Sequence, residues 1–151
     1  MSFQVKLGKD CKLYRNKGTY ADPDWSEVDL VQDLTLALTK GEADATTRGY
    51  GSWEAVVAAL KQGTVDFGLL WNPADEHFAA FLNSFLNDST VEVLILDGPV
   101  SGTGSAGNQG LRVTVQVFNF RRNEQLRNTV AAEVTIKPTY AENAPAWYTV
   151  S

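Results

Sequence analysis

Strict alternation of apolar and polar residues recurs along the chain, and it restricts most of the chain to strands. Residues 28–38 place apolar side chains at the even positions, with Gln32 as the one interruption: Val28, Leu30, Leu34, Leu36 and Leu38. Residues 130–136 repeat the pattern. Because successive side chains of a strand point to opposite faces, these segments predict an antiparallel sheet with one buried face and one polar face.

Residues 111–120 alternate in the same way but change phase. The odd positions 111–117 are apolar, after which Phe118 and Phe120 fall on even positions. One extra residue in a strand produces this change, so we expect a β-bulge near Phe118. Further strands are expected at 11–16, 64–71, 91–96 and 129–139.

The apolar residues of 53–60 fit both a helical and a strand spacing. A short turn at 61–63 before the strand-like run that follows favours a hairpin, so we expect a strand here. The preceding segment, 39–52, is polar and punctuated by glycine. We expect it to form a flexible arm of the long hairpin.

One segment has the spacing of a helix, over residues 72–87. Asn72 is the expected N-cap, Pro73 the first helical residue, and Asp75 and Glu76 complement the dipole of the N-terminus. The apolar residues follow at helical spacing: Phe78, Phe81, Leu82, Phe85 and Leu86. This stripe predicts a helix that packs on the sheet.

The composition indicates one domain over residues 1–151. A 44% hydrophobic and 21% charged chain of this length can bury its own core. The single cysteine excludes an internal disulfide framework, and the chain begins without an apolar leader, so synthesis in a cytoplasm is expected. A net charge of −5 argues against a surface that wraps nucleic acid.

Gly102, Gly104 and Gly107 spell the G-x-G-x-x-G motif of dinucleotide sites. In those sites the glycines open a helix whose N-terminus binds the phosphates. Here an alternating strand follows at residue 111, so we interpret residues 98–110 as a mobile loop between two strands.

Residue types that carry catalysis or bind metals are sparse. We interpret His77 as a surface helix residue and Cys11 as a buried structural thiol. Four acidic residues gather around one turn: Asp22, Asp24, Glu27 and Asp29. Trp25 interrupts them, and the sequence lacks the glycine-hinged pattern of a calcium-binding loop. The sequence therefore predicts no enzyme, no metal and no cofactor, although dispersed carboxylates leave a hydrolase open as an alternative.

The order of segments resembles the major tail (tube) proteins of long-tailed bacteriophages and, more distantly, the tube proteins of contractile injection machines. The resemblance spans residues 9–140 and depends on five stretches: Asp33-Leu34-Thr35-Leu36, Glu42-Ala43-Asp44-Ala45-Thr46-Thr47-Arg48, Gly51-Ser52-Trp53, Gly63-Thr64-Val65-Asp66-Phe67 and Trp71-Asn72-Pro73-Ala74-Asp75. It implies a β-sandwich or partial barrel flanked by one helix. It also implies homohexameric rings, made in the bacterial host cytoplasm and stacked in the virion into a hollow tube through which DNA passes. Tail-tip (initiator) and terminator proteins would be further partners.

Weakly acidic walls suit a channel for a polyanion. We therefore expect four acids to face the lumen: Asp29, Asp33, Asp66 and Glu133. The segments 39–52 and 98–110 are expected to be flexible assembly loops that become ordered against neighbouring subunits. Their candidate residues are Glu42, Asp44, Thr47, Arg48, Gly102, Gly104 and Gly107.

The C-terminal tail, 141–151, carries Trp147 and Tyr148, which we expect to dock on the body or on a neighbour. The alternative function is a soluble small-molecule-binding β-barrel. It would require a closed apolar cavity lined by four residues: Phe67, Leu69, Phe118 and Phe120.

Overall fold

The computed structural model describes residues 7–8, 11–124, 126–127 and 129–151. Its elements follow one another along the chain as β1 Lys12–Asn16, β2 Trp25–Glu27, β3 Val31–Asp44, β4 Val56–Leu70, α1 Glu76–Asn87, β5 Val91–Leu96, β6 Gln109–Asn123, β7 Ala131–Pro138 and β8 Ala146–Thr149. A short 3-10 turn, Arg48–Tyr50, lies between β3 and β4. No described helix has the length and apolar character needed to cross a membrane.

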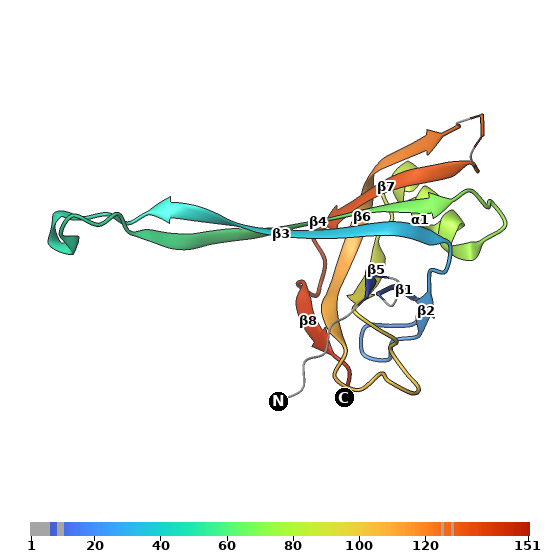
Figure 1. The fold of residues 1–151 in the computed structure, drawn as a ribbon, viewed down its shortest axis with the longest axis horizontal. Coiled ribbons are helices and arrows are strands. Elements are labelled where there is room, and N and C mark those ends of the chain that lie inside the picture. The colour runs from blue at the N-terminus through green and yellow to red at the C-terminus, as the bar shows by residue number, and fades with distance from the viewer. Residues whose placement is uncertain (1–6, 9–10, 125, 128) are drawn as a thin grey trace.

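The strands form one antiparallel, eight-stranded sheet in the order β2-β1-β5-β6-β7-β4-β3, with β8 added to β6. β6 changes partner along its length, since its first residues pair with β8 and its later residues pair with β7. The sheet curls into a half-barrel around α1, and the β3–β4 hairpin extends far beyond it (Figure 1). This confirms the predicted fold, mainly β with one flanking helix and a long hairpin.

The main core lies between the concave face of the sheet and α1. The predicted alternation holds in β6 and β7, whose buried residues pack there with the buried part of β4. Phe81 of α1 is fully buried and meets Phe67 edge-to-face at 5.3 Å between ring centroids. Each large side chain buried in this way contributes about 1.5–3 kcal/mol to folding.

The predicted bulge is confirmed at Phe118. Val117 pairs with Ile136 and Asn119 with Thr135, so Phe118 is the extra residue and it is exposed. The phase change brings Phe120 back to the core, where its ring lies 5.8 Å from that of Phe78.

A second, smaller core covers the other face of β5. Leu94 and Leu96 of β5 pack there with Tyr14 and Val150, while the alternate residues of β5 face the main core. Burial on both faces explains why residues 91–96 form an almost continuous apolar run instead of alternating. Tyr148 of β8 also packs against this core and meets Trp25 at 6.2 Å between ring centroids, so it docks on the body as predicted, whereas Trp147 is 57% exposed.

The helix begins later than predicted. Asp75, not Asn72, is the N-cap, because its side chain accepts a hydrogen bond from the N–H of Phe78 at 3.4 Å. Asn72 instead closes the preceding turn, accepting from the N–H of Ala74 on its side chain and from that of Asp75 on its carbonyl. The helix ends at Asn87 as predicted, with Asp88 in the left-handed conformation at φ 58°.

The buried face of α1 also differs from the predicted stripe. Phe85 and Leu86 are exposed, whereas Ser84 is buried. The Ser84 hydroxyl donates to the carbonyl of Ser89 at 2.6 Å and accepts from the N–H of Val117 at 3.2 Å. Hydrogen bonding through this small residue fixes α1 close to β6 and rotates the helix away from the purely apolar stripe.

The hairpin is more regular than expected. Residues 56–60 are strand as predicted, but the turn expected at 61–63 is wrong, because β4 continues through it. Gly63 pairs with Leu38, and a Cβ on Gly63 would lie 3.3 Å from the Leu38 side chain and 3.7 Å from Pro138, so glycine permits this close packing. β3 likewise continues to Asp44, so the first part of segment 39–52 is paired strand.

Candidate assembly surfaces

The outer hairpin, which we call the arm (residues 38–62), is exposed along almost its entire length. It carries large apolar side chains, including Trp53 at 75% and Leu60 at 82% exposure. Figure 1 shows no other part of the body near the outer arm. Clustered apolar exposure of this kind marks a surface that another molecule covers.

The outer end of the arm is held by local hydrogen bonds. Ala45 N–H donates to the carbonyl of Ala55 at 2.9 Å, and the Thr46 hydroxyl accepts from the N–H of Ala55 at 3.0 Å. The Asp44 carboxylate accepts from the N–H of Thr46, and hydrogen bonds from Thr46 lower the pKa of Asp44. The predicted assembly residues Glu42, Asp44, Thr47 and Arg48 all lie in the arm.

The convex surface of β3, β4, β7 and β6, which we call the polar face, lies opposite the core. One row across it consists of Thr35, Asp66, Thr135 and Asn119, which are register partners in adjacent strands. The Thr135 hydroxyl donates to Asp66 at 2.5 Å. Glu133, two residues before Thr135 on the same face, lies 3.8 Å from Arg121 in an exposed ion pair.

The four acids expected to face a lumen do not all lie together. Asp66 and Glu133 share the polar face, and Asp33 lies exposed in a β3 irregularity beside it. Asp29 lies in the turn before β3, and its negative charge is close enough to His77 of α1 to favour the protonated form of that ring. A lumen position for these residues stays a prediction.

The glycine-rich loop leads into strand β6 and not into a helix, so it lacks the geometry of a dinucleotide site. Gly102, Gly104 and Gly107 have φ values of 85°, 80° and 83°, which other residues rarely adopt. Buried Asn108 donates to the carbonyls of Pro99 and Gly104, each at 2.9 Å. The glycines thus shape turns around a fixed asparagine, and the last residues of segment 98–110 already belong to β6.

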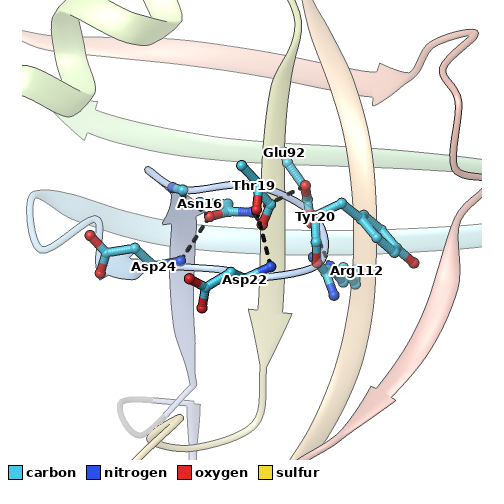
Figure 2. Close-up of polar contacts among 8 residues, drawn as sticks. Asn16, Thr19, Tyr20, Asp22, Asp24, Glu92 and Arg112 are labelled. Carbon is cyan, nitrogen blue, oxygen red and sulfur yellow. Dashed lines mark hydrogen bonds and ion pairs between the residues drawn. The ribbon is translucent and has the colours of Figure 1, made fainter.

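A polar network holds residues 17–24 over the outer face of β1, β5 and β6. Figure 2 shows Asn16 accepting from the N–H of Asp24 at 2.9 Å and donating to Glu92 at 3.2 Å. Glu92 also pairs with Arg112, which donates to the carbonyl of Tyr20 at 2.7 Å and stacks on its ring at 3.8 Å. The turn that carries Asp22 and Asp24 is therefore held by hydrogen bonds between its backbone groups and the side chains of Asn16 and Arg112.

No group of three possible metal ligands is present among the described residues. Glu27, one of the acids around this turn, pairs with Lys12 at 2.7 Å. Cys11 is exposed, so the interpretation as a buried thiol is wrong: it precedes β1, and its thiol donates to the carbonyl of Leu7 at 3.7 Å.

His77 is 3% exposed, so its interpretation as a surface residue is wrong. Arg15 donates to its Nδ1 at 2.9 Å, and the Ser26 hydroxyl lies 3.1 Å from its Nε2. Burial, and then the nearby Arg15 charge, lower the pKa of His77. Because Nδ1 accepts a hydrogen bond, the proton of the neutral ring lies on Nε2, which therefore cannot take the Ser26 proton as a general base. The histidine joins α1 to β1 and β2.

Three of the four residues proposed to line a ligand cavity pack into the main core, and the fourth lies on the opposite face of the sheet. Phe67 and Leu69 are packed in the main core, and the bulge places Phe118 in solvent while Phe120 faces inward. An open groove of about 910 Å³ lies instead at the base of the arm, and Leu38, Gly63, Pro138 and Trp147 are among its lining residues.

Sequence reasoning missed two features of these surfaces. Lys40 and Lys61 face each other across the arm, which only the register reveals. The exposure of the apolar residues at 56–60 was also missed. The sequence feature that could have indicated this exposure is the polar, glycine-rich segment that this apolar run faces across the hairpin.

No family model and no curated protein matches the sequence. Solved structures do match the fold. A chain from the tail of an empty GTA particle with C6 symmetry is 9% identical, with a TM-score of 0.71 and coverage of 97% of this chain and 100% of that one. A chain of the SPP1 tail tube is 10% identical, with a TM-score of 0.66 over 88% of this chain and 75% of that one.

A chain of the anti-feeding prophage baseplate, solved with six-fold symmetry, is 10% identical, with a TM-score of 0.61 and coverage of 100% and 99%. These likenesses extend over nearly the whole chain at very low identity. The chain therefore has the fold found in these tail assemblies.

Proposed function

We propose that this chain is the subunit of a viral tail tube, in which it assembles as stacked hexameric rings around a lumen that conducts DNA. The observation that supports this most is the fold likeness over nearly the whole chain to chains of a GTA tail and the SPP1 tail tube. The described residues offer a curled sheet with one polar face and an arm with exposed apolar residues, both of which suit a wall built from copies.

In this proposal the polar face lines the lumen. Asp33 and Asp66 contribute negative charge on or beside it, Glu133 is paired there with Arg121, and Asp29 lies apart in the turn before β3. Repulsion between these carboxylates and phosphates would let DNA pass without binding, because tight binding requires clustered cations. The tube serves as a structural conduit, and the chain does no catalysis.

Electron microscopy of the purified, concentrated protein tests this function. Tubes or rings with six-fold symmetry are the expected result. Particles that stay monomeric at all concentrations, or that carry a bound small molecule, would contradict the proposal and favour the ligand-binding alternative.

The loop at residues 98–110 is proposed as a second assembly segment, beside the arm. Deletion of residues 101–107 is expected to abolish tubes while lowering the melting temperature of the monomer only slightly, since most of these residues are exposed. Sedimentation and a thermal melt provide the two measurements. Normal tubes from the deletion variant would remove the loop from the proposal. Tail-tip initiator and terminator proteins are the further partners that it implies.

A further inference from the structure

The groove at the base of the arm combines an apolar floor with positive charge. Leu38 and Trp147, which are 54% and 57% exposed, line it together with Leu111, Pro138 and Pro145. Lys40 and Lys61 line its rim and lie directly opposite each other in the β3–β4 register, on the same ribbon face as Leu38. Like charges in directly opposed positions destabilise a ribbon.

Neither lysine has an ion pair within the described part of the chain. Lys137 of β7 also lines the groove and has no ion pair among the described residues, so the groove offers three uncompensated cations above an apolar floor. Its chemistry fits a partner segment that carries two acids beside a large apolar side chain.

The outer end of the arm has this composition. Asp44 and Glu54 lie on opposite strands of the ribbon there, diagonally on either side of the hydrogen bond from the Ala45 N–H to the Ala55 carbonyl. Neither acid has an ion pair among the described residues, and Trp53 beside them is 75% exposed.

The arm cannot fill its own groove. Figure 1 shows the ribbon running away from the body, so its outer end and its base lie at opposite ends of the arm. A contact between one copy's arm and another copy's groove joins two different surfaces, and such head-to-tail contacts repeat from copy to copy.

We propose that the outer end of the arm of one copy docks in the basal groove of a second copy, pairing Asp44 and Glu54 with Lys40 and Lys61 and placing Trp53 on the apolar floor. This inference rests on the proposed function and specifies the contact between its subunits.

Two charge-reversed chains test the contact. The groove variant carries K40E and K61E, and the arm variant carries D44K and E54K. Each variant alone brings like charges together at every docking site, so the tube mass recovered by sedimentation is expected to fall at least about tenfold. All four positions are exposed, and a thermal melt of each variant checks that the body is folded.

An equimolar mixture is the decisive sample. The acidic arm of the groove variant meets the lysine groove of the arm variant, and the lysine arm meets the glutamate groove, so tubes are expected to return toward the wild-type amount. A single chain with all four substitutions should also assemble. If the substitutions instead prevented assembly by disrupting the structure of the arm or the groove, mixing the two variants would not restore tubes.

Four results would overturn the inference. Wild-type tube yield from each variant alone, or no recovery in the mixture, removes this docking site while leaving the tube function intact. Normal tubes from the groove variant with lost retention of double-stranded DNA would assign the lysines to nucleic acid instead. Failure of the wild-type chain to form any tube would remove the proposed function and this inference together.

Discussion

The two halves of strand β4 show how differently the arm and the body of this protein are supported. In the body, Val65, Phe67 and Leu69 are at most 3% exposed, while in the arm Val57 and Leu60 are 54% and 82% exposed. Both halves pair with β3 in antiparallel register. The body half also pairs with β7 on its other edge, so the two regions differ both in their backbone pairing and in whether the apolar side chains are covered.

This difference separates two tasks within one strand. The body buries enough apolar area to fold by itself, whereas the arm leaves its apolar area for a partner. Substitutions in the body should therefore change the stability of the monomer, and substitutions in the arm should change assembly. Three experiments test this separation.

Replacing residues 41–60 by Asn-Gly, a favoured two-residue hairpin turn, has the largest expected effect. Tubes should be lost completely, because the exposed segment that contacts neighbours is gone. The melting temperature of the monomer should change by less than about 4 °C, the shift that corresponds to about 1 kcal/mol in a domain of this size. Sedimentation and calorimetry measure the two effects, and a loss of folding would show that the arm supports the body.

Phe81→Ala in the body should lower the free energy of unfolding by about 3–5 kcal/mol, because it leaves a cavity in the main core. The matched control in the arm is Leu60→Ala, which should change the stability by less than about 0.5 kcal/mol. Urea unfolding of the dilute monomer compares them. Equal losses would contradict the separation between the two regions.

The smallest expected effect is a pH dependence of the stability of the body between pH 7.5 and 5.5. The pKa of His77 is lowered in the folded chain by burial, while the unfolded chain has its ordinary value of about 6.5. As the pH falls through about 6.5, the unfolded chain takes up a proton that the folded chain does not, so stability decreases by at most about 1.4 kcal/mol per pH unit. Below the lowered pKa this contribution becomes constant.

Urea unfolding at pH 7.5 and 5.5 measures this slope. His77→Asn retains an acceptor that can face Arg15 but does not titrate, so its slope should be smaller than that of the wild type. An unchanged slope would mean that other groups cause the pH dependence.

Local patterns in the sequence were sufficient for much of the fold. The alternation at 111–117 and 130–136, the bulge at Phe118 and the end of α1 were all predicted, because each depends on neighbouring residues in the chain. The start of α1 was not, because Asn72 and Asp75 are both good caps and their competition is decided by the turn between them.

Features that depend on distant partners could not be read in this way. His77 is buried because Arg15 and Ser26, more than fifty residues earlier in the chain, bond to it. The candidate surfaces divide similarly. The arm was recognised from its composition, but the opposed lysines at its base require the register of two long strands.

The bulge at Phe118 also determines where this chain can change its length. A loop such as residues 98–110 is held at its ends, so a gain or loss of residues between them need not disturb either strand. Loss of the single residue Phe118 also preserves the register, because Val117 and Asn119 already pair with adjacent residues of β7, Ile136 and Thr135. Phe120 would still face the main core in the phase of Val117, whereas loss of one residue elsewhere in β6 would turn every later side chain over.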